Sequence, residues 1–446
     1  MIPTIGEALV LFSQGTLTPS TLLERLLQRI QSWDEELHTY VSLDEAGARQ
    51  AASEADEAWA KGHAGPLCGI PISIKDVVDV AQMVTGCGTS LFSEPAERDA
   101  TLVRRLREAG AIILGKAHLH PFAFGLSGEN PELGTPRNPA GAGSMPGGSS
   151  SGSAAGVAAE LALASIGTDT GGSVRVPAAF CGVVGFKPSY GLISRAGVFP
   201  VAESMDHVGL LVRDVTDCRP LLDVLSGADE RDPTSHILPP QYPLPGRVRL
   251  GLIGELHQGS DLSVRTCIEN NLARRPGIEV KTVSLPGLKA ARRAYGTIVQ
   301  AEIAAVHQAR WEENPNAYDG MGQGMIERGC ATTAVMLLAA QQERTRFARE
   351  VEALWGDFDA LVCPTVPMVA PPLGAEKVRI NDREVSVAGA LVRNTSPFSM
   401  IGVPALSLPA GGAQGLPVGL QLIAPYGQDI RLLTLAERMV LGLKLL

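Results

Sequence analysis

The sequence of 446 residues has no uninterrupted apolar run long enough to cross a membrane. A membrane-spanning helix needs roughly 20 mostly apolar residues, so we expect no transmembrane segment. The first residues, Met-Ile-Pro-Thr-Ile-Gly-Glu, contain neither a basic cluster nor a long apolar stretch, and we therefore expect no signal peptide. These absences predict a cytoplasmic protein that does not bind membranes.

The sequence also has no excess of positive charge, because it contains 38 Lys and Arg but 47 Asp and Glu, and its net charge is −9. Such a chain is a poor partner for nucleic acid, which we exclude as its main partner.

The seven cysteines form no C-x-x-C pair and are odd in number, which is typical of reduced thiols in a cytosolic protein. Cys181 lies in the stretch Ala-Phe-Cys-Gly-Val-Val, and we interpret it as a core residue. Aromatic residues amount to only 4%, which neither favours nor excludes aryl substrates.

Strand-like apolar segments alternate with helical segments over most of the chain. This alternation predicts an α/β protein with a large mixed, mostly parallel β-sheet covered by helices on both faces. Residues 1–62 are expected to form an N-terminal helical layer, with Thr18 and Ser20 as candidate caps. The strand candidates are 71–75, 111–115, 183–186, 248–253, 280–285, 360–363, 405–408 and 419–423, and the later helix candidates are 99–109, 153–164, 288–311, 332–355 and 431–443. We expect a single domain over residues 1–446, with the Asp- and Pro-rich segment 229–246 as a surface loop.

Two serines in glycine-rich surroundings and an upstream lysine carry the chemistry of this sequence. The segments read Gly69-Ile-Pro-Ile-Ser-Ile-Lys75-Asp76, Pro146-Gly-Gly-Ser149-Ser-Ser-Gly152 and Gly167-Thr-Asp169-Thr-Gly-Gly-Ser173. Serine becomes a nucleophile when a base takes its proton, and lysine can be that base when burial lowers its pKa. Lys75 ends an apolar strand candidate, which allows desolvation, but an ordinary salt bridge with Asp76 also fits. Lys116, in Leu-Gly-Lys, is a rival base in a similar setting.

Histidines offer alternative bases and ligands. His207 directly follows Asp206, so a Ser-His-Asp triad built on it stays open. His118 and His120 have the spacing of a metal-binding pair, but no third ligand is evident, and we interpret them as polar loop residues. We therefore expect no metal and no cofactor.

The two serine segments also have alternative interpretations. The first could be a linker, a phosphate cradle or a nucleophile elbow around Ser150. The small-residue helix that follows argues against a linker, the Gly-Lys-Ser/Thr of a P-loop is absent, and 138–146 is a poor strand for an elbow. In the second segment, consecutive glycines before Ser173 allow backbone N–H groups to point one way and form an oxyanion hole, although an ordinary tight turn also fits.

Together these segments resemble the amidase signature family, closely over residues 65–210 and more loosely over the C-terminal half. Further matching stretches are Gly134-Thr-Pro-Arg-Asn-Pro, Val184-Gly-Phe-Lys-Pro-Ser-Tyr-Gly, Cys363-Pro-Thr-Val-Pro and Gly402-Val-Pro-Ala-Leu-Ser-Leu-Pro. The order and spacing of the motifs make this a specific signal. Departures from the family's common residues occur at Ser151, at His118 and Pro121, and at Leu210, and they concern the pocket and packing rather than the serines and lysine.

The resemblance implies a Ser–cisSer–Lys triad with Ser173 as nucleophile, Ser149 as bridging serine and Lys75 as base. It also implies an oxyanion hole formed by the backbone of Thr170, Gly171 and Gly172 up to Ser173. The expected activity is hydrolysis of a linear carboxylic amide through an acyl-serine intermediate, with Lys75 rather than Lys116 as the base.

Two other functions are compatible with the resemblance. The A subunit of a tRNA-dependent amidotransferase would hydrolyse glutamine and pass ammonia to a partner, and it would need an arginine and an acid to hold the glutamine. Arg328, Arg393 and Asp429 are available for that purpose. A non-catalytic binding protein on the same fold is the third interpretation. The partners that we expect are a small amide, bound by residues 122–130 and the C-terminal half, and at most a second copy of the chain.

Overall fold

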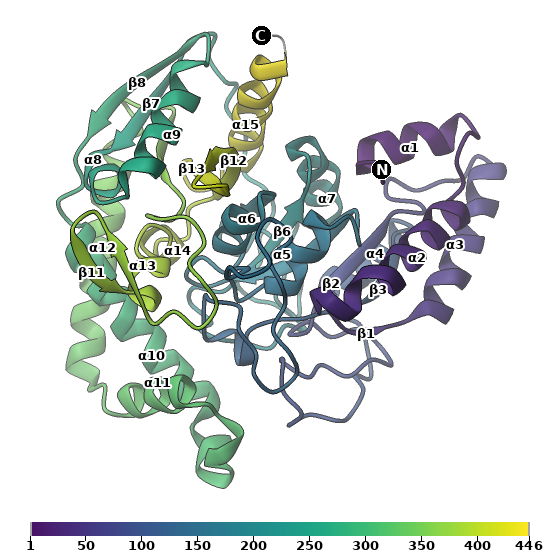
Figure 1. Ribbon diagram of the computed structural model, residues 1–446, viewed down its shortest axis with the longest axis horizontal. Coiled ribbons are helices and arrows are strands. Elements are labelled where there is room, and N and C mark those ends of the chain that lie inside the picture. Colours follow the sequence, from purple (N-terminus) through teal and green to yellow (C-terminus); the bar gives the residue numbers. More distant parts are fainter. Residues whose placement is uncertain (1, 445–446) are drawn as a thin grey trace.

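The computed structural model describes residues 2–444 and builds them around one sheet of 11 strands (Figure 1). The strand order is β1-β3-β2-β4-β6-β5-β12-β13-β9-β7-β8. The strands are β1 (Tyr40–Leu43), β2 (Pro71–Lys75), β3 (Ile112–Ala117), β4 (Ala164–Asp169), β5 (Val184–Lys187), β6 (His207–Val212), β7 (Val248–Ile253), β8 (Ile278–Val283), β9 (Ala360–Pro364), β12 (Ala405–Ala413) and β13 (Leu416–Ile423). A separate hairpin pairs β10 (Lys377–Ile380) with β11 (Arg383–Ser386).

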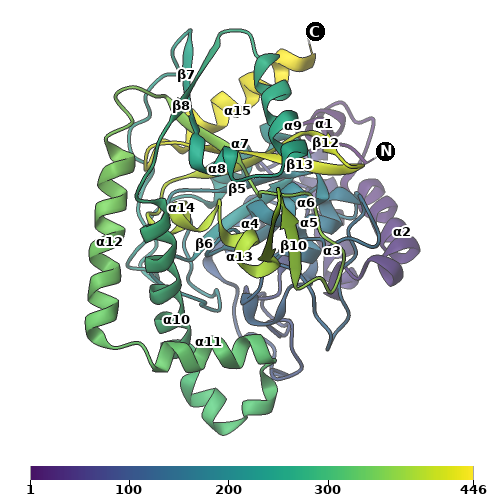
Figure 2. The ribbon, with the colours of Figure 1, turned by 60° about the vertical axis from the view of Figure 1, so that its left-hand side comes forward.

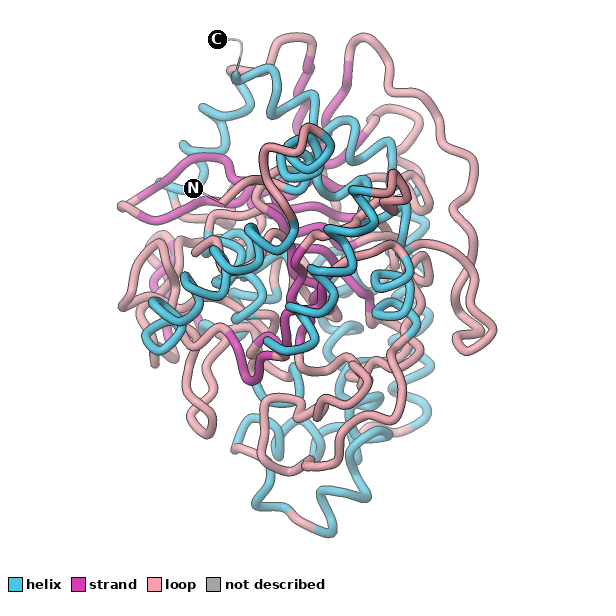
Figure 3. Tube along the Cα trace, turned by 90° about the vertical axis from the view of Figure 1, so that its right-hand side faces the viewer, coloured by secondary structure: helices cyan, strands magenta, loops and turns pink. Residues whose placement is uncertain are grey.

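The sheet is mixed, as the sequence predicts. Parallel neighbours form two blocks, β3-β2-β4 and β9-β7-β8, and the other neighbouring strands of the described chain are antiparallel. The chain crosses from β2 to β3 through α4 (Thr101–Glu108), and it returns from β3 past β2 to β4 through α5 (Ser151–Ala158). Because such crossovers are right-handed, the two helices cover opposite faces of the sheet. The predicted helices on both faces are therefore present, and Figure 3 shows strands between layers of helix.

The remaining helices complete these layers and add an arm of helices. They are α1 (Ile5–Ser13), α2 (Pro19–Leu37), α3 (Glu45–Ala60), α6 (Arg175–Cys181), α7 (Cys218–Leu225), α8 (Gly254–Gln258), α9 (Leu262–Ala273), α10 (Leu288–Glu313), α11 (Gly320–Cys330), α12 (Ala334–Glu352), α13 (Val387–Val392), α14 (Ser396–Met400) and α15 (Asp429–Lys444). Helix α10 contacts both α11 and α12, and the three helices form the arm that extends from the sheet (Figure 2).

Several local predictions are confirmed, and two are wrong. Strand β2 has the predicted bounds and is buried throughout, and Thr18 caps α2 by accepting a hydrogen bond from the Thr21 N–H, whereas Ser20 lies inside that helix. The helix predicted over 153–164 instead ends at Ala158, and β4 begins at Ala164. A positive φ at Glu160 turns the chain, and the following apolar residues become a buried strand beside β2.

The two halves of the chain share the sheet, because β2–β6 come from before the 229–246 segment and β7–β9, β12 and β13 from after it. No helix or strand lies between α7 and β7 in the described chain. We propose from this shared sheet that the chain is one domain and that 229–246 is a loop. Residues 1, 445 and 446 of the predicted domain lie outside the described residues.

Candidate active site

Lys75 ends β2 with its side chain completely buried. Its Nζ lies 2.8 Å from Ser149 Oγ and 2.8 Å from Thr168 Oγ1. Burial lowers the pKa of Lys75 to about 7, although the negative charges of Asp169 and Asp206 oppose this shift. An amine in this state is neutral for much of the time near neutral pH, so it can accept a proton.

Lys116, the other candidate base, forms an ion pair instead of contacting a serine of the site. Its Nζ forms a buried ion pair of 3.1 Å with Asp76 Oδ1 and donates to the Val84 carbonyl at 3.1 Å. Asp76 therefore pairs with Lys116, on the neighbouring strand β3, and leaves Lys75 without a carboxylate partner. This separation leaves Lys75 as the lysine that lies against a serine hydroxyl.

Backbone contacts bring the two serine segments together. Ser149 follows a cis peptide bond from Gly148, and its carbonyl accepts a hydrogen bond from the His120 N–H at 3.1 Å. The next N–H, that of Ser150, donates to the Ser173 carbonyl at 3.2 Å. The structure thus places the Ser173 backbone next to the Lys75–Ser149 pair. Among the hydrogen bonds of residues 2–444, this backbone bond and bonds between the Ser150 hydroxyl and the Thr168 backbone join the two serine segments, and none links the hydroxyls of Ser149 and Ser173.

Residues 170–173 form a loop with free backbone donors, which we call the oxyanion loop. In the described structure, the N–H groups of Gly171, Gly172 and Ser173 donate to no protein acceptor, although Ser173 is only 4% exposed. Gly172 has a φ of +138°, and a Cβ there would overlap with the Thr395 hydroxyl. A Cβ on Gly171 would overlap with the Tyr295 hydroxyl. Gly172 is therefore required by its positive φ together with its close contact, and the amides of both glycines remain available to an oxyanion.

A buried ion pair between residues on either side of the oxyanion loop stabilises it. Arg175 donates to both oxygens of Asp169, at 2.9 Å through Nε and 2.8 Å through Nη2. Asp169 also accepts from the Val174 N–H at 3.2 Å. Burial alone would raise the pKa of Asp169, but the Arg175 guanidinium holds it well below its usual range. The pair is completely buried, so the residues on both sides of the oxyanion loop are held in place.

The histidines do not complete a serine triad. Nδ1 of His207 lies 2.6 Å from the Met205 carbonyl and 3.1 Å from that of Asp169, and burial lowers its pKa well below the usual value. The Asp206 carboxylate accepts from hydroxyl and backbone donors instead of from this imidazole. His118 contacts backbone atoms of Leu119, and the described residues contain no cluster of His, Cys, Asp or Glu that could hold a metal.

Sequence reasoning missed Thr168, the second partner of Lys75. The available signal was its place in the Gly167-Thr-Asp-Thr-Gly-Gly segment at the end of a buried strand. The elbow interpretation of Ser150 is wrong, because no strand directly precedes it in the described chain: the nearest upstream strand, β3, ends at Ala117. Ser150 is instead the residue that directly precedes α5, and its hydroxyl donates to the backbone carbonyl of Thr168 at 3.3 Å.

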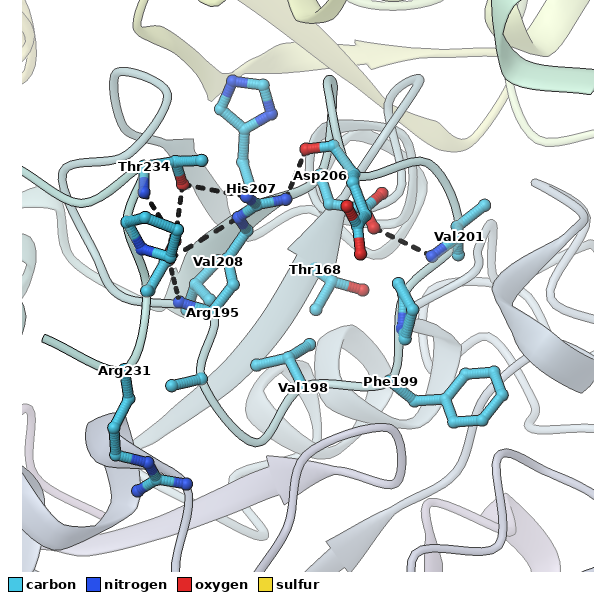
Figure 4. Close-up of a pocket in the computed structure, with 15 residues that line it drawn as sticks. Thr168, Arg195, Val198, Phe199, Val201, Asp206, His207, Val208, Arg231 and Thr234 are labelled. Carbon is cyan, nitrogen blue, oxygen red and sulfur yellow. Dashed lines mark hydrogen bonds and ion pairs between the residues drawn. The ribbon is translucent and has the colours of Figure 1, made fainter. Parts of the chain in front are cut away.

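A cavity of about 330 Å³ opens beside this network (Figure 4). Thr168, Asp206 and His207 line it on the side of the sheet, and the segments 195–203 and 231–234 line the rest. Arg195 joins those two segments through bonds to Thr234 at 2.8 Å and to the Asp232 carboxylate. The cavity therefore reaches Thr168, the residue whose hydroxyl binds Lys75.

Comparisons with known proteins identify the family of this chain. A family model described as Amidase matches residues 21–433. The A subunit of glutamyl-tRNA(Gln) amidotransferase from Roseiflexus castenholzii is 36% identical over 97% of this chain and 94% of that protein. A solved structure described as a crystal structure of amidase has a TM-score of 0.91 at 36% identity, covering 98% of this chain and 99% of that one. The same amidotransferase component from Thermotoga maritima has a TM-score of 0.77 at 29% identity, covering 93% and 90% of the two chains.

The chain belongs to the amidase signature family, and it has that family's fold. It is accordingly an enzyme of the amidase type, which acts on carbon–nitrogen bonds of amides. The interpretation as a non-catalytic binding protein is therefore wrong. No helix in residues 2–444 is long and apolar enough to cross a membrane.

Proposed function

We propose that this protein hydrolyses a linear carboxylic amide through an acyl-enzyme on Ser173, with Ser149 as proton relay and Lys75 as base. The observation that supports this most is the buried Lys75 Nζ, which lies 2.8 Å from the Ser149 hydroxyl. A base without a carboxylate partner, a bridging hydroxyl and a loop of free amides together meet the needs of acyl transfer.

The first half of the reaction forms the acyl-enzyme. Neutral Lys75 accepts the proton of Ser149 while Ser149 accepts that of Ser173, because a hydroxyl can donate and accept at once. The Ser173 oxygen attacks the amide carbon, and the amides of Gly171, Gly172 and Ser173 stabilise the oxyanion. The proton then returns through Ser149 to the leaving nitrogen, and the C–N bond breaks.

The second half releases the acid. A water molecule gives its proton to the same relay and attacks the acyl carbon, and the ester bond to Ser173 breaks as that oxygen takes a proton back. Thr168 supports both halves, because its hydroxyl oxygen accepts an N–H of Lys75 at 2.8 Å. With one N–H donated to Thr168, the single lone pair of the neutral amine is free to accept the proton of Ser149, whose oxygen lies 2.8 Å away.

A second candidate is the glutamine-hydrolysing A subunit of a tRNA-dependent amidotransferase. The named relatives support it, since the Roseiflexus castenholzii protein is of this kind and matches almost the whole chain. The charged residues considered for glutamine give it no support: Asp429 accepts the N–H and hydroxyl of Ser189 at 2.7 and 2.6 Å, and Arg393 bonds to the Gly259 carbonyl. Arg328 lies on the exposed side of α11. The solved amidase structure has a TM-score of 0.91 against 0.77 for the Thermotoga maritima protein. The relatives matched by sequence nevertheless favour the second candidate over the first.

One experiment tests the function and separates the candidates. The purified chain is incubated alone with a panel of small amides that includes glutamine, and ammonia or amine release is measured. Turnover of amides other than glutamine supports the first candidate, and glutaminase activity that needs added partner proteins supports the second. Wild-type protein that neither turns over an amide nor reacts at Ser173 with a fluorophosphonate would contradict the mechanism. The cytoplasmic location and a homodimer remain predictions.

A further inference from the structure

Asp206 is a buried carboxylate that the proposed proton transfers do not use, and it lies at the start of the oxyanion loop. It directly precedes β6, whose first residue, His207, pairs with Asp169 at the end of β4. In an antiparallel pair, the next two residues to face each other are Asp206 and Thr170. There a side-chain hydrogen bond of 2.5 Å joins Thr170 Oγ1 to Asp206 Oδ1.

The same carboxylate also holds the wall of the adjoining cavity. It accepts the N–H of Val201 at 2.8 Å and that of Ala202 at 3.1 Å, and Figure 4 shows the bond to Val201 beside Thr168. Asp206 is only 6% exposed, so none of these partners is easily replaced by water. The carboxylate thus connects the oxyanion loop with the segment 201–202.

We propose that Asp206 is a positioning residue for amide hydrolysis, which holds Thr170 against the end of β6 and thereby orients the oxyanion loop. This inference rests on the function proposed above. An oxyanion is stabilised by donors that are already in place before the reaction. The donors of Gly171 and Gly172 follow Thr170 directly, so a shift of Thr170 moves them, and a displacement of about 1 Å can cost about 100-fold in rate.

The charge of Asp206 provides a second, independent signature. It is one of the negative charges, with Asp169, that raise the pKa of Lys75 against the effect of burial. Burial raises the pKa of Asp206 itself to about 6, so it is mostly charged at pH 7, and Arg195 and Tyr295 are further ionisable groups that interact with it. A neutral residue at this position removes that charge, so the pKa of Lys75 falls. The rise of the rate with pH then begins at lower pH. A purely structural residue would change the rate or the stability and leave this part of the pH profile in place.

The test compares three variants with the wild type in the rate of amide hydrolysis as a function of pH. Asp206→Asn keeps the size of the side chain and removes its charge, and Thr170→Val removes the hydrogen bond and keeps the charge. Asp232→Asn is the matched control, because Asp232 is 5% exposed, lines the same cavity and bonds to Arg195 and Thr234 rather than to the oxyanion loop.

We expect kcat to fall about 10- to 100-fold in Asp206→Asn and Thr170→Val with a smaller change in KM. The part of the pH profile in which the rate rises with pH, the acid limb, should move to lower pH in Asp206→Asn alone. Asp232→Asn should keep the wild-type dependence of the rate on pH. Wild-type kcat in both loop variants, or an unmoved acid limb in Asp206→Asn, overturns the inference. If Asp206→Asn does not fold, the kcat of Thr170→Val decides whether Thr170 positions the loop. A wild-type protein that does not react with a fluorophosphonate at Ser173 contradicts the proposed function instead, so the two failures are distinguishable.

Discussion

Replacing Lys75 with methionine tests the central claim that a buried, largely neutral amine drives the reaction. An ordinary lysine, with a pKa of 10.5, is neutral in only about one molecule in 3,000 at pH 7. With the pKa near 7, about half of the molecules carry the neutral base at that pH. The wild-type rate should therefore rise through about pH 7 and level off above it, and Lys75→Met should lose about 100-fold to 10,000-fold, the usual contribution of a general base.

The same shift predicts how stability depends on pH. Between about pH 7 and pH 10.5 the unfolded chain binds a proton on Lys75 that the folded chain does not, so the wild-type free energy of unfolding rises with pH in that window. Below about pH 7, burial of the charged amine lowers the free energy of unfolding by its full amount, which is roughly 5 kcal/mol. In Lys75→Met this rise is absent, while the hydroxyls of Ser149 and Thr168 lose their donor at a cost of roughly 1–3 kcal/mol each at all pH values.

Urea unfolding of both proteins between about pH 6 and pH 9.5 measures the difference, with amide hydrolysis followed over the same range. The stability of wild type relative to Lys75→Met should increase as the pH rises. Equal pH dependence in the two proteins, or a wild-type rate that does not change between about pH 6 and pH 8, would refute the reasoning. Recovery of Lys75→Met activity at high pH would show that another group is the base.

Three further substitutions test the remaining parts of the site. Ser173→Ala should abolish hydrolysis and fluorophosphonate labelling and leave the circular dichroism spectrum unchanged; residual turnover at the wild-type rate would remove Ser173 as nucleophile. Gly172→Ala should lower kcat about 100-fold or more, because its Cβ overlaps with Thr395 and displaces the oxyanion donors, and an unchanged kcat would show that the loop adapts. Arg175→Met should destabilise the protein by about 3–5 kcal/mol in urea unfolding, since it leaves Asp169 buried without its cation, and a change below about 1 kcal/mol would contradict that account.

Local sequence determined several of the strands and the chemical components of the site, but it did not indicate β1, β4 or β6. Apolar residues bounded by glycine and proline predict β2 and β7 with the bounds that the structure shows, and the glycines around Ser173 indicate a turn with free amides. These features depend on neighbouring residues, so they are visible without the fold. The segment 153–164 is harder to assign, because short apolar runs of small residues suit a helix and a buried strand alike.

Only the tertiary structure decided which groups act on one another. Lys75 and Lys116 end neighbouring strands in similar sequence surroundings, but Asp76 pairs with Lys116 across the sheet, and Lys75 is left against Ser149 and Thr168. Burial and partners set the pKa of an amine, and both are supplied by residues far away in the chain. For the same physical reason, no local pattern indicated that Asp206 would face Thr170: the antiparallel register of β4 and β6 creates that contact.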